Sequence, residues 1–265
     1  MKTILTRDLK AAGKLLLRYF GRTLRVTRKE SHASVVTQAD VAVERFLVER
    51  IRACYPDQNI LGEETGWQNL GSEFTWVIDP LDGTSNFAAG LPWFGVMLAV
   101  LRNAQPVMAA VYLPATDTLY FAEKGNGVFR NGQRVRVSTA KRLCDALCAF
   151  ALDPTNDLQK ARRNVAVFEQ LVARCRNLRM TNCLVDFCST VDGRIGVCLN
   201  QMTRIWDIAP FVLMFPEAGG VFTDQNGEPI RFDLEGDPLQ AEYAVVGGNH
   251  RLHRQVVELI ERLEG

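Results

Sequence analysis

The sequence predicts a layered α/β protein built from two closely packed halves. Two helical patterns precede a run of short apolar segments, and strand and helix patterns then alternate to the end of the chain. The 265 residues, 47% of them hydrophobic, suffice for a sizeable buried core. We expect two helices covering an antiparallel sheet in residues 1–140, and an alternating α/β half in residues 141–265.

Two amphipathic helices should open the chain. Leu9, Ala12, Leu16 and Tyr19 recur at helical spacing, and residues 38–55 repeat this pattern. Charged residues interrupt the apolar run at the N-terminus, so we expect no signal peptide. No apolar run reaches the ~18 residues that a membrane span needs.

Short strands should follow. Proline and glycine residues predict loops over residues 56–71. An apolar run over residues 74–78 predicts a buried strand that ends at Asp79. The pair Asn131-Gly132 predicts a hairpin turn, because that turn requires positive φ. Further strands are expected over residues 93–101, 106–113 and 118–122.

The C-terminal half alternates between strand and helix patterns without a linker before it. Strands are expected over residues 146–151, 177–181, 195–199, 220–224 and 243–247. Helices are expected over residues 158–175, 184–192, 207–218 and 250–263. Two halves packed in this way should place a functional site in the crevice between them.

Composition excludes several kinds of partner and site. The chain has 31 basic and 30 acidic residues, so no general attraction to nucleic acid or acidic membranes is expected. The seven cysteines form no CxxC, which argues against a zinc site or a disulfide framework and favours the reducing cytoplasm. His32, His250 and His253 lie away from every motif, and we expect them at the surface.

The segment WVIDPLDGTSNF, residues 76–87, carries the most chemical information. Asp79 and Asp82 are three residues apart, with Pro80 stiffening the backbone between them. Two carboxylates held in this way repel each other unless a cation lies between them. Magnesium suits an all-oxygen site that keeps room for water and phosphate oxygens. If a helix begins at Gly83-Thr84, its free N–H groups would face an anion.

Plainer explanations exist for each acidic segment alone. Asp-Pro and Asp-Gly are common in surface turns, and Asp82 could cap a helix. Glu63-Glu64 in a glycine-rich loop could be a solvated face, and Trp206-Asp207 could be an ordinary helix start. A strand as apolar as WVI running directly into two aspartates is harder to explain as a bare turn.

The ordered set of motifs resembles the inositol monophosphatase family. GEE, WVIDPLDGTSNF, WD at a helix start and EAGG at residues 217–220 follow one another with family-like spacing, and VVTQAD at residues 35–40 matches a T-x-x-D element. The resemblance covers nearly the whole chain. It implies an αβαβα fold, a lithium-sensitive, Mg²⁺-dependent hydrolase of phosphate monoesters, and a homodimer.

The resemblance also implies metal ligands. Glu63, Asp79 and the backbone carbonyl of Leu81 would bind the first magnesium ion, and Asp79, Asp82 and Asp207 the second. A weaker third ion would use Glu63 and water. The polar stretch that contains Lys29 and Ser34 would help to close over these ions.

Further implied roles concern water and phosphate. Asp40 and Thr84 would act with Glu63 to orient and deprotonate the attacking water. Gly83, Thr84 and Ser85 would hold the phosphate. No serine, cysteine or histidine nucleophile is required, because metal charge and activated water suffice.

The substrate half departs from the family pattern. Asn200 stands where an acid is expected, and Asn182-Cys183 stands in place of a Gly-Ser/Thr pair. We assign Arg179, Cys183 and Asn200 to the substrate pocket. Arg179 and Arg204 could instead be solvent-exposed, but as anion ligands they would favour a bisphosphate over inositol 1-phosphate.

Two other functions need consideration. A haloacid dehalogenase-type phosphatase requires D-x-D-x-T/V, and the spacing D-P-L-D-G-T does not match it. A member of the resembling family could also act mainly as a non-catalytic partner of another protein. The complete set of metal-ligating residues favours an enzyme.

Overall fold

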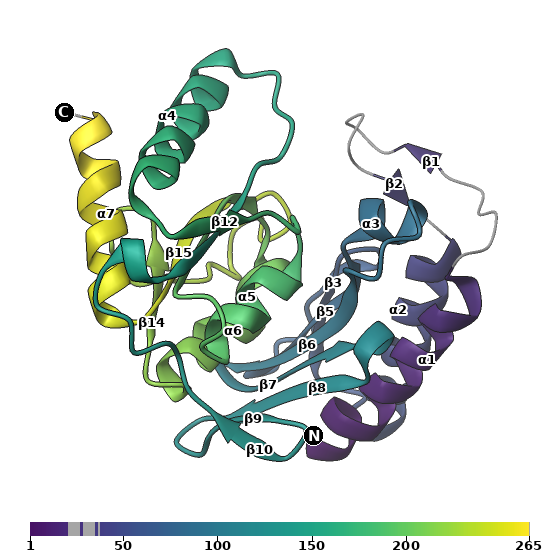
Figure 1. The fold of residues 1–265 in the computed structure, drawn as a ribbon. Helices are drawn as coiled ribbons and strands as arrows, with labels where there is room; N and C mark the ends of the chain where they lie inside the picture. Colours follow the sequence, from purple (N-terminus) through teal and green to yellow (C-terminus); the bar gives the residue numbers. More distant parts are fainter. Residues whose placement is uncertain (21–26, 29–34, 37, 265) are drawn as a thin grey trace.

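The computed structural model describes residues 1–20, 27–28, 35–36 and 38–264, which form five layers (Figure 1). In order, the layers are a helix pair, an eight-stranded sheet, a second helix pair, a five-stranded sheet and a third helix pair. The αβαβα arrangement is confirmed. Strands β1 (Thr27–Arg28) and β2 (Val35–Val36) form a separate two-stranded ribbon. The predictions for Lys29, His32, Ser34 and Thr37 lie outside the described residues.

The larger sheet has the strand order β10-β9-β8-β7-β6-β5-β3-β4. Its strands are β3 (Asn59–Gly62), β4 (Gly66–Gln68), β5 (Phe74–Asp82), β6 (Gly95–Arg102), β7 (Gln105–Leu113), β8 (Thr118–Glu123), β9 (Gly127–Arg130) and β10 (Gln133–Val135). Only the pairing of β3 with β5 is parallel among these strands. The predicted hairpin turn is confirmed, since Asn131 and Gly132 have φ values of 48° and 81°.

Two predictions for this sheet were wrong in extent. Residues 59–62 and 66–68 were assigned to loops, but they form the short strands β3 and β4. Burial explains β3, because Ile60 and Leu61 are fully enclosed between the sheet's two helical layers. Strand β5 continues beyond Asp79 through Pro80 to Asp82.

The smaller sheet has the order β12-β11-β13-β15-β14. Its strands are β11 (Leu147–Ala151), β12 (Asn177–Arg179), β13 (Val197–Thr203), β14 (Val221–Asp224) and β15 (Tyr243–Gly248). Strand β11 pairs in parallel with both β12 and β13, whereas β15 is antiparallel to β13 and β14. Strand β13 begins two residues later than predicted and extends to Thr203, so that it leads directly into the next helix.

The helices divide among the three helical layers. Helix α1 (Leu9–Tyr19), which continues a π-helical turn over Ile4–Asp8, packs with α2 (Gln38–Cys54) on the outer face of the larger sheet. Helices α5 (Leu184–Val191) and α6 (Ile205–Glu217) lie between the sheets. Helices α4 (Leu158–Arg174) and α7 (His250–Glu264) cover the smaller sheet. The short helix α3 (Thr84–Ala88) follows β5.

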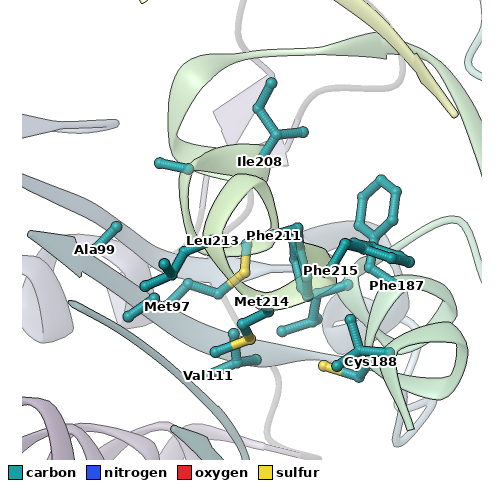
Figure 2. Close-up of a cluster of buried hydrophobic side chains, with 14 of the residues drawn as sticks. Met97, Ala99, Val111, Phe187, Cys188, Ile208, Phe211, Leu213, Met214 and Phe215 are labelled. Atoms are coloured by element: carbon teal, nitrogen blue, oxygen red, sulfur yellow. The ribbon is translucent and has the colours of Figure 1, made fainter. Parts of the chain in front are cut away.

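Strand periodicity explains how one sheet supports two cores. In β6, Val96, Leu98 and Val100 belong to the cluster with α1 and α2, whereas Met97 and Ala99 belong to the cluster with α6. Figure 2 shows the second cluster, in which the α6 side chains Phe211, Leu213, Met214 and Phe215 lie among Met97, Ala99, Val111, Phe187 and Cys188. Helix α6 is thereby fixed across the larger sheet.

The surface assignment of the histidines holds for His250 but is wrong for His253. His250 is exposed, whereas His253 is only 7% exposed, and its Nε2 lies 2.7 Å from the Thr223 hydroxyl oxygen. Burial, followed by the charge of His250, lowers the pKa of His253 to about 4. His253 follows the helical period of α7 and points inward, which spacing alone could have indicated.

The described residues contain neither a disulfide nor a helix that could span a membrane. All seven cysteines are free thiols, and five of them are buried or half-buried. None of the helices in the described ranges has the length and apolar character needed to cross a bilayer.

Candidate metal centre and active site

A bulge in β5 turns Asp79 and Asp82 to the same side of the larger sheet. Asp79 pairs with Met97 and Asp82 pairs with Gly95, so two residues of β5, Pro80 and Leu81, lie opposite one residue of β6. Residues three apart on a regular strand point to opposite faces. The extra residue of the bulge moves Asp82 to the same face as Asp79, so both carboxylates face the layer that contains α6.

Helix α6 supplies the third carboxylate. Asp207 is in its first turn, where Asp207 Oδ2 accepts a 2.6 Å hydrogen bond from the Arg204 amide. This contact caps the helix and fixes the side chain. Asp79, Asp82 and Asp207 each place a carboxylate oxygen within 4.8 Å of the others, a spacing that suits a shared cation.

Burial disfavours the charged form of each of the three carboxylates, and neighbouring negative charges add to this effect at Asp79 and Asp82. Burial, with the negative charges of Glu63, Asp82, Asp207 and Asp40 added, raises the pKa of Asp79 well above its ordinary value. Burial and the charge of Asp207 do the same to the pKa of Asp82, and burial raises the pKa of Asp207 to about 7. The Glu63 amide donates a 3.3 Å hydrogen bond to the carbonyl oxygen of Ile78, so the predicted residue Glu63 lies beside Asp79.

The donor set fits a hard divalent cation. Asp79 Oδ1 accepts a 3.0 Å hydrogen bond from the Leu81 amide, but Asp79 Oδ2 is buried with no hydrogen-bond partner in the described part of the chain. A buried carboxylate oxygen without a partner is costly unless a cation meets it. Several clustered carboxylate oxygens match the preferences of Mg²⁺ rather than those of softer metals.

Glu44 organises the loop that carries Glu63, and the sequence analysis missed it. Glu44 lies four residues after Asp40 in α2 and is fully buried. Its two carboxylate oxygens accept hydrogen bonds from the amides of Glu64 (3.0 Å) and Thr65 (2.6 Å). A Cβ on Gly62 would lie 2.2 Å from Glu44 Oε1, so this approach requires glycine. The i, i+4 spacing of Asp40 and Glu44 was a visible signal.

Thr84 is anchored beside the predicted carbonyl ligand. Its hydroxyl donates a 2.8 Å hydrogen bond to the carbonyl oxygen of Leu81. The Thr84 oxygen therefore has lone pairs left to accept a hydrogen bond from water. Asp40, which is also predicted to orient the water, is 3% exposed and lies in the first turn of α2.

Gly83 and Cys183 meet where the two halves join. Gly83 has a φ of 86°, and a Cβ on it would lie 2.5 Å from the Trp93 carbonyl and 3.3 Å from Cys183 Cβ. Asn86 Nδ2 donates hydrogen bonds to the carbonyls of Trp93 (3.0 Å) and Thr181 (2.9 Å). Glycine thus permits the chain after β5 to lie directly against the segment before α5.

The other predicted substrate residues are Ser85, Arg179 and Asn200. Within the described residues, the hydrogen bonds of Arg179 and Asn200 go to their neighbours in the sequence and not to the three metal-centre carboxylates. Ser85 is exposed in α3. Arg179 is exposed, and its Nη1 donates to Asn177 Oδ1 and to the Leu178 carbonyl. Asn200 lies in β13 beside Ala151, and its side-chain oxygen accepts a 3.0 Å hydrogen bond from the Met202 amide.

Comparison with known proteins identifies the group to which the chain is related. The model of the "Inositol monophosphatase family" matches residues 1–264. An "Inositol-1-monophosphatase" of Rhizobium meliloti is 34% identical over 255 residues, which cover 95% of this chain and 92% of the relative. A "Nus factor SuhB" of Xylella fastidiosa is 30% identical over 97% of this chain and 93% of its own.

A solved structure shows the same relationship. The structure of an inositol monophosphatase from Thermotoga maritima superimposes with a TM-score of 0.85 at 28% identity, over 97% of this chain and 95% of that one. The family model, the similarity of the sequences and the shared fold agree over almost the full length. The chain belongs to the inositol monophosphatase family.

Proposed function

We propose that the protein is a Mg²⁺-dependent phosphatase that hydrolyses small phosphate monoesters. The observation that carries the proposal is the convergence of Asp79, Asp82 and Asp207 from two elements onto one point. Hydrolysis forms a bond from a water oxygen to phosphorus and breaks the bond to the ester oxygen. The water's protons pass to the leaving alcohol and the phosphate, so the products are an alcohol and inorganic phosphate.

The residues that would hold the ions are those of the bulge, the α6 terminus and the Glu63 loop. In this proposal Glu63, Asp79 and the Leu81 carbonyl hold one Mg²⁺, and Asp79, Asp82 and Asp207 hold a second. A third, weaker ion would use Glu63. Bound Mg²⁺ would supply positive charge to the phosphoryl oxygens and make water a better nucleophile at neutral pH.

The protein's own residues would orient the water and bind the phosphate. Because the Thr84 hydroxyl donates to the Leu81 carbonyl, its oxygen can accept a hydrogen bond from water and hold it in one orientation. Asp40 and Glu63 would accept the proton that the water loses. The N–H groups that follow Gly83 would bind phosphate oxygens.

A second candidate function follows from the similarity to the Nus factor SuhB of Xylella fastidiosa. In that case the chain would act mainly by binding another protein, and its near-neutral charge argues against direct RNA binding. The exposed side chains of Leu91, Trp93 and Met180 offer apolar surface for a partner. In the phosphatase proposal a second copy of the chain would cover this surface instead, and light scattering should then give the mass of a homodimer.

Phosphate release from a simple ester separates the two functions. We expect release of inorganic phosphate from p-nitrophenyl phosphate or inositol 1-phosphate with Mg²⁺, its loss with a chelator, and inhibition by Li⁺. A protein that binds Mg²⁺ but hydrolyses no ester in a broad panel would favour the binding function instead.

A further inference from the structure

Asp153 lies at the C-terminal end of β11 in the smaller sheet. The neighbouring strand β13 leads from the same end of the sheet to Asp207 of the metal centre. Strands β11 and β13 run in parallel, with Ala151 beside Asn200. Asp153 follows β11 by two residues, and β13 leads through Arg204 to Asp207. The carboxyl ends of neighbouring parallel strands meet at one edge of a sheet, where ligands commonly bind. Asp153 is thus placed on the same side as Asp207.

One short segment, residues 182–184, contacts both Asp153 and Asp82 through hydrogen bonds. Asn182 Nδ2 donates a 2.7 Å hydrogen bond to Asp153 Oδ1, and Asn182 Oδ1 accepts one of 2.8 Å from the Leu152 amide. Two residues further on, the Leu184 amide donates a 2.7 Å hydrogen bond to Asp82 Oδ1. Asn182 has a φ of 55°, a conformation that asparagine tolerates better than most residues. The carboxylate of Asp153 is therefore held in a defined position.

Asp153 lies beside the metal centre without belonging to it. Asn182, which holds Asp153 Oδ1, precedes Cys183, and a Cβ on Gly83, the residue after Asp82, would lie 3.3 Å from Cys183 Cβ. Asp153 is not one of the three carboxylates that converge within 4.8 Å. Burial raises the pKa of the Asp153 carboxyl itself, against the opposing effects of Asn182 and Lys160. A hydrogen-bond donor or a cation would stabilise this carboxylate.

The neighbouring cations do not offer a site for a second anion. Lys160 Nζ lies 3.1 Å and Arg204 Nη2 lies 3.2 Å from carboxylate oxygens of Glu242. Arg204 also donates to the Gln240 carbonyl. Glu242 therefore offsets the charges of both cations, and Asp153 interacts electrostatically with Lys160. This arrangement argues against the sequence-based expectation that Arg204 favours a bisphosphate.

We propose that Asp153 is a specificity-determining residue that binds the leaving group of the substrate. Its carboxylate would accept a hydrogen bond from a hydroxyl or an ammonium group on the alcohol part of the phosphate ester. A leaving group with a second phosphate would instead be repelled. This inference rests on the proposed phosphatase function.

The test compares esters whose leaving groups present different groups to Asp153. Inositol 1-phosphate presents hydroxyls, phosphoethanolamine an ammonium, fructose 1,6-bisphosphate a second phosphate beside its hydroxyls, and p-nitrophenyl phosphate no hydrogen-bond donor. Asp153→Asn removes the charge while keeping an oxygen that can accept from Asn182. At saturating Mg²⁺, we expect it to lower kcat/KM about tenfold, or about 1.4 kcal/mol, for whichever of inositol 1-phosphate and phosphoethanolamine is the better substrate. The loss should be mainly in KM.

For p-nitrophenyl phosphate, the kcat/KM of Asp153→Asn should stay within about twofold of the native value. For fructose 1,6-bisphosphate, its kcat/KM should rise relative to that for inositol 1-phosphate. Asp157→Asn is the matched control, because Asp157 lies in the same segment and caps α4 through the Gln159 and Lys160 amides, which asparagine can also do. It should leave the ratios of kcat/KM between the four esters unchanged.

The outcomes separate this inference from the proposed function. If the native protein hydrolyses no ester, the phosphatase proposal fails. If it hydrolyses p-nitrophenyl phosphate but Asp153→Asn leaves every ratio unchanged, only the role of Asp153 is wrong. An equal loss on all four esters would also overturn that role, because it would place Asp153 in the metal centre rather than at the leaving group.

Discussion

The Leu184 amide donates a 2.7 Å hydrogen bond to Asp82 Oδ1, so the start of α5 in the C-terminal half holds a carboxylate that β5 delivers from the N-terminal half. Asp82 lies close to Asp79 and Asp207. The metal centre therefore depends on the packing of α5 against the end of β5. A change at that contact should weaken ion binding more than it destabilises the fold.

Neutralising Asp82 should weaken metal binding without weakening the metal-free fold. Asp82→Asn keeps an oxygen to accept from Leu184 and removes repulsion among buried carboxylates. We expect the Tm of the metal-free variant to equal or exceed that of the native protein, and its rise with added Mg²⁺ to be much smaller. Thermal unfolding with and without Mg²⁺ measures both quantities.

Asp237→Asn provides the control for that experiment. Asp237 is exposed and likewise accepts a hydrogen bond from a backbone amide, that of Leu239. Its substitution should leave the Mg²⁺-dependent rise in Tm unchanged. A native-like rise in Asp82→Asn would remove Asp82 from the ligand set.

The Thr84 hydroxyl should matter for turnover more than for substrate binding. Thr84→Ala removes the group that donates to Leu81 and that we expect to orient water. Losses of ~10²–10⁴-fold in kcat are typical when proton transfer or water positioning fails. Thr84→Ser should recover most of the rate, because it restores the hydroxyl. Steady-state kinetics that show a loss confined to KM would make Thr84 a phosphate contact only.

Glu44 should control the affinity for Mg²⁺ although it is not a predicted ligand. Glu44→Ala leaves the amides of Glu64 and Thr65 without their acceptor, and an unpaired donor costs about 1–3 kcal/mol where water cannot replace the acceptor. Groups that orient metal ligands typically change affinity ~10–100-fold. Calorimetric titration with Mg²⁺ should show that weakening, and Glu44→Gln should show less of it.

Helix α2 supplies the control for the Glu44 variants. Glu49 lies on its exposed side and pairs with Arg45. Glu49→Ala should therefore leave Mg²⁺ affinity unchanged. Equal affinities in Glu44→Ala and Glu49→Ala would show that the Glu63 loop keeps its shape without Glu44.

The buried His253 should make the protein less stable in mild acid. Its pKa is lowered from 6.5 to about 4 in the folded state, so the unfolded chain binds the proton more readily. Its contribution to stability is complete above the unfolded pKa and declines as the pH falls from about 6.5 to about 4, with about 1.4 kcal/mol for each unit of pKa difference. Below that window the contribution is constant.

Denaturant unfolding at pH 4–7 measures this effect as the difference between native protein and His253→Gln. Glutamine can still hydrogen-bond to Thr223 but does not titrate. The free energy of unfolding should decline less steeply with falling pH in the variant. Parallel curves would show that His253 is not responsible for acid sensitivity.

Much of the fold was predictable because periodicity and turn chemistry are local. The helix face of Leu9, Ala12 and Leu16 is buried as expected, and Asn131-Gly132 makes the expected turn. The short strands β3 and β4 were missed because their glycines resemble loop residues, and only tertiary burial of Ile60 and Leu61 distinguishes them.

The acidic motifs of the site were also predictable, but its supporting residues were not. The spacing of Asp79 and Asp82 predicts a cation site. The bulge that turns the two side chains to one face can be seen only in the pairing with β6. The spacing of Glu44 from Asp40 indicates a shared helix face, but not the contact of Glu44 with the Glu63 loop. Asp153 lies outside every motif. Their roles depend on which elements the fold brings together.

The most direct test of the metal-centre proposal is phosphate release from a small ester measured across a Mg²⁺ titration, for the native protein and Asp82→Asn. We expect no release without metal and saturable activation of the native protein. At the same Mg²⁺ concentration the rate of the variant should be ~100-fold or more lower, because the loss of a metal ligand removes several kcal/mol of transition-state stabilisation. Activity that persists in excess chelator, or equal activity of the two proteins, would contradict it.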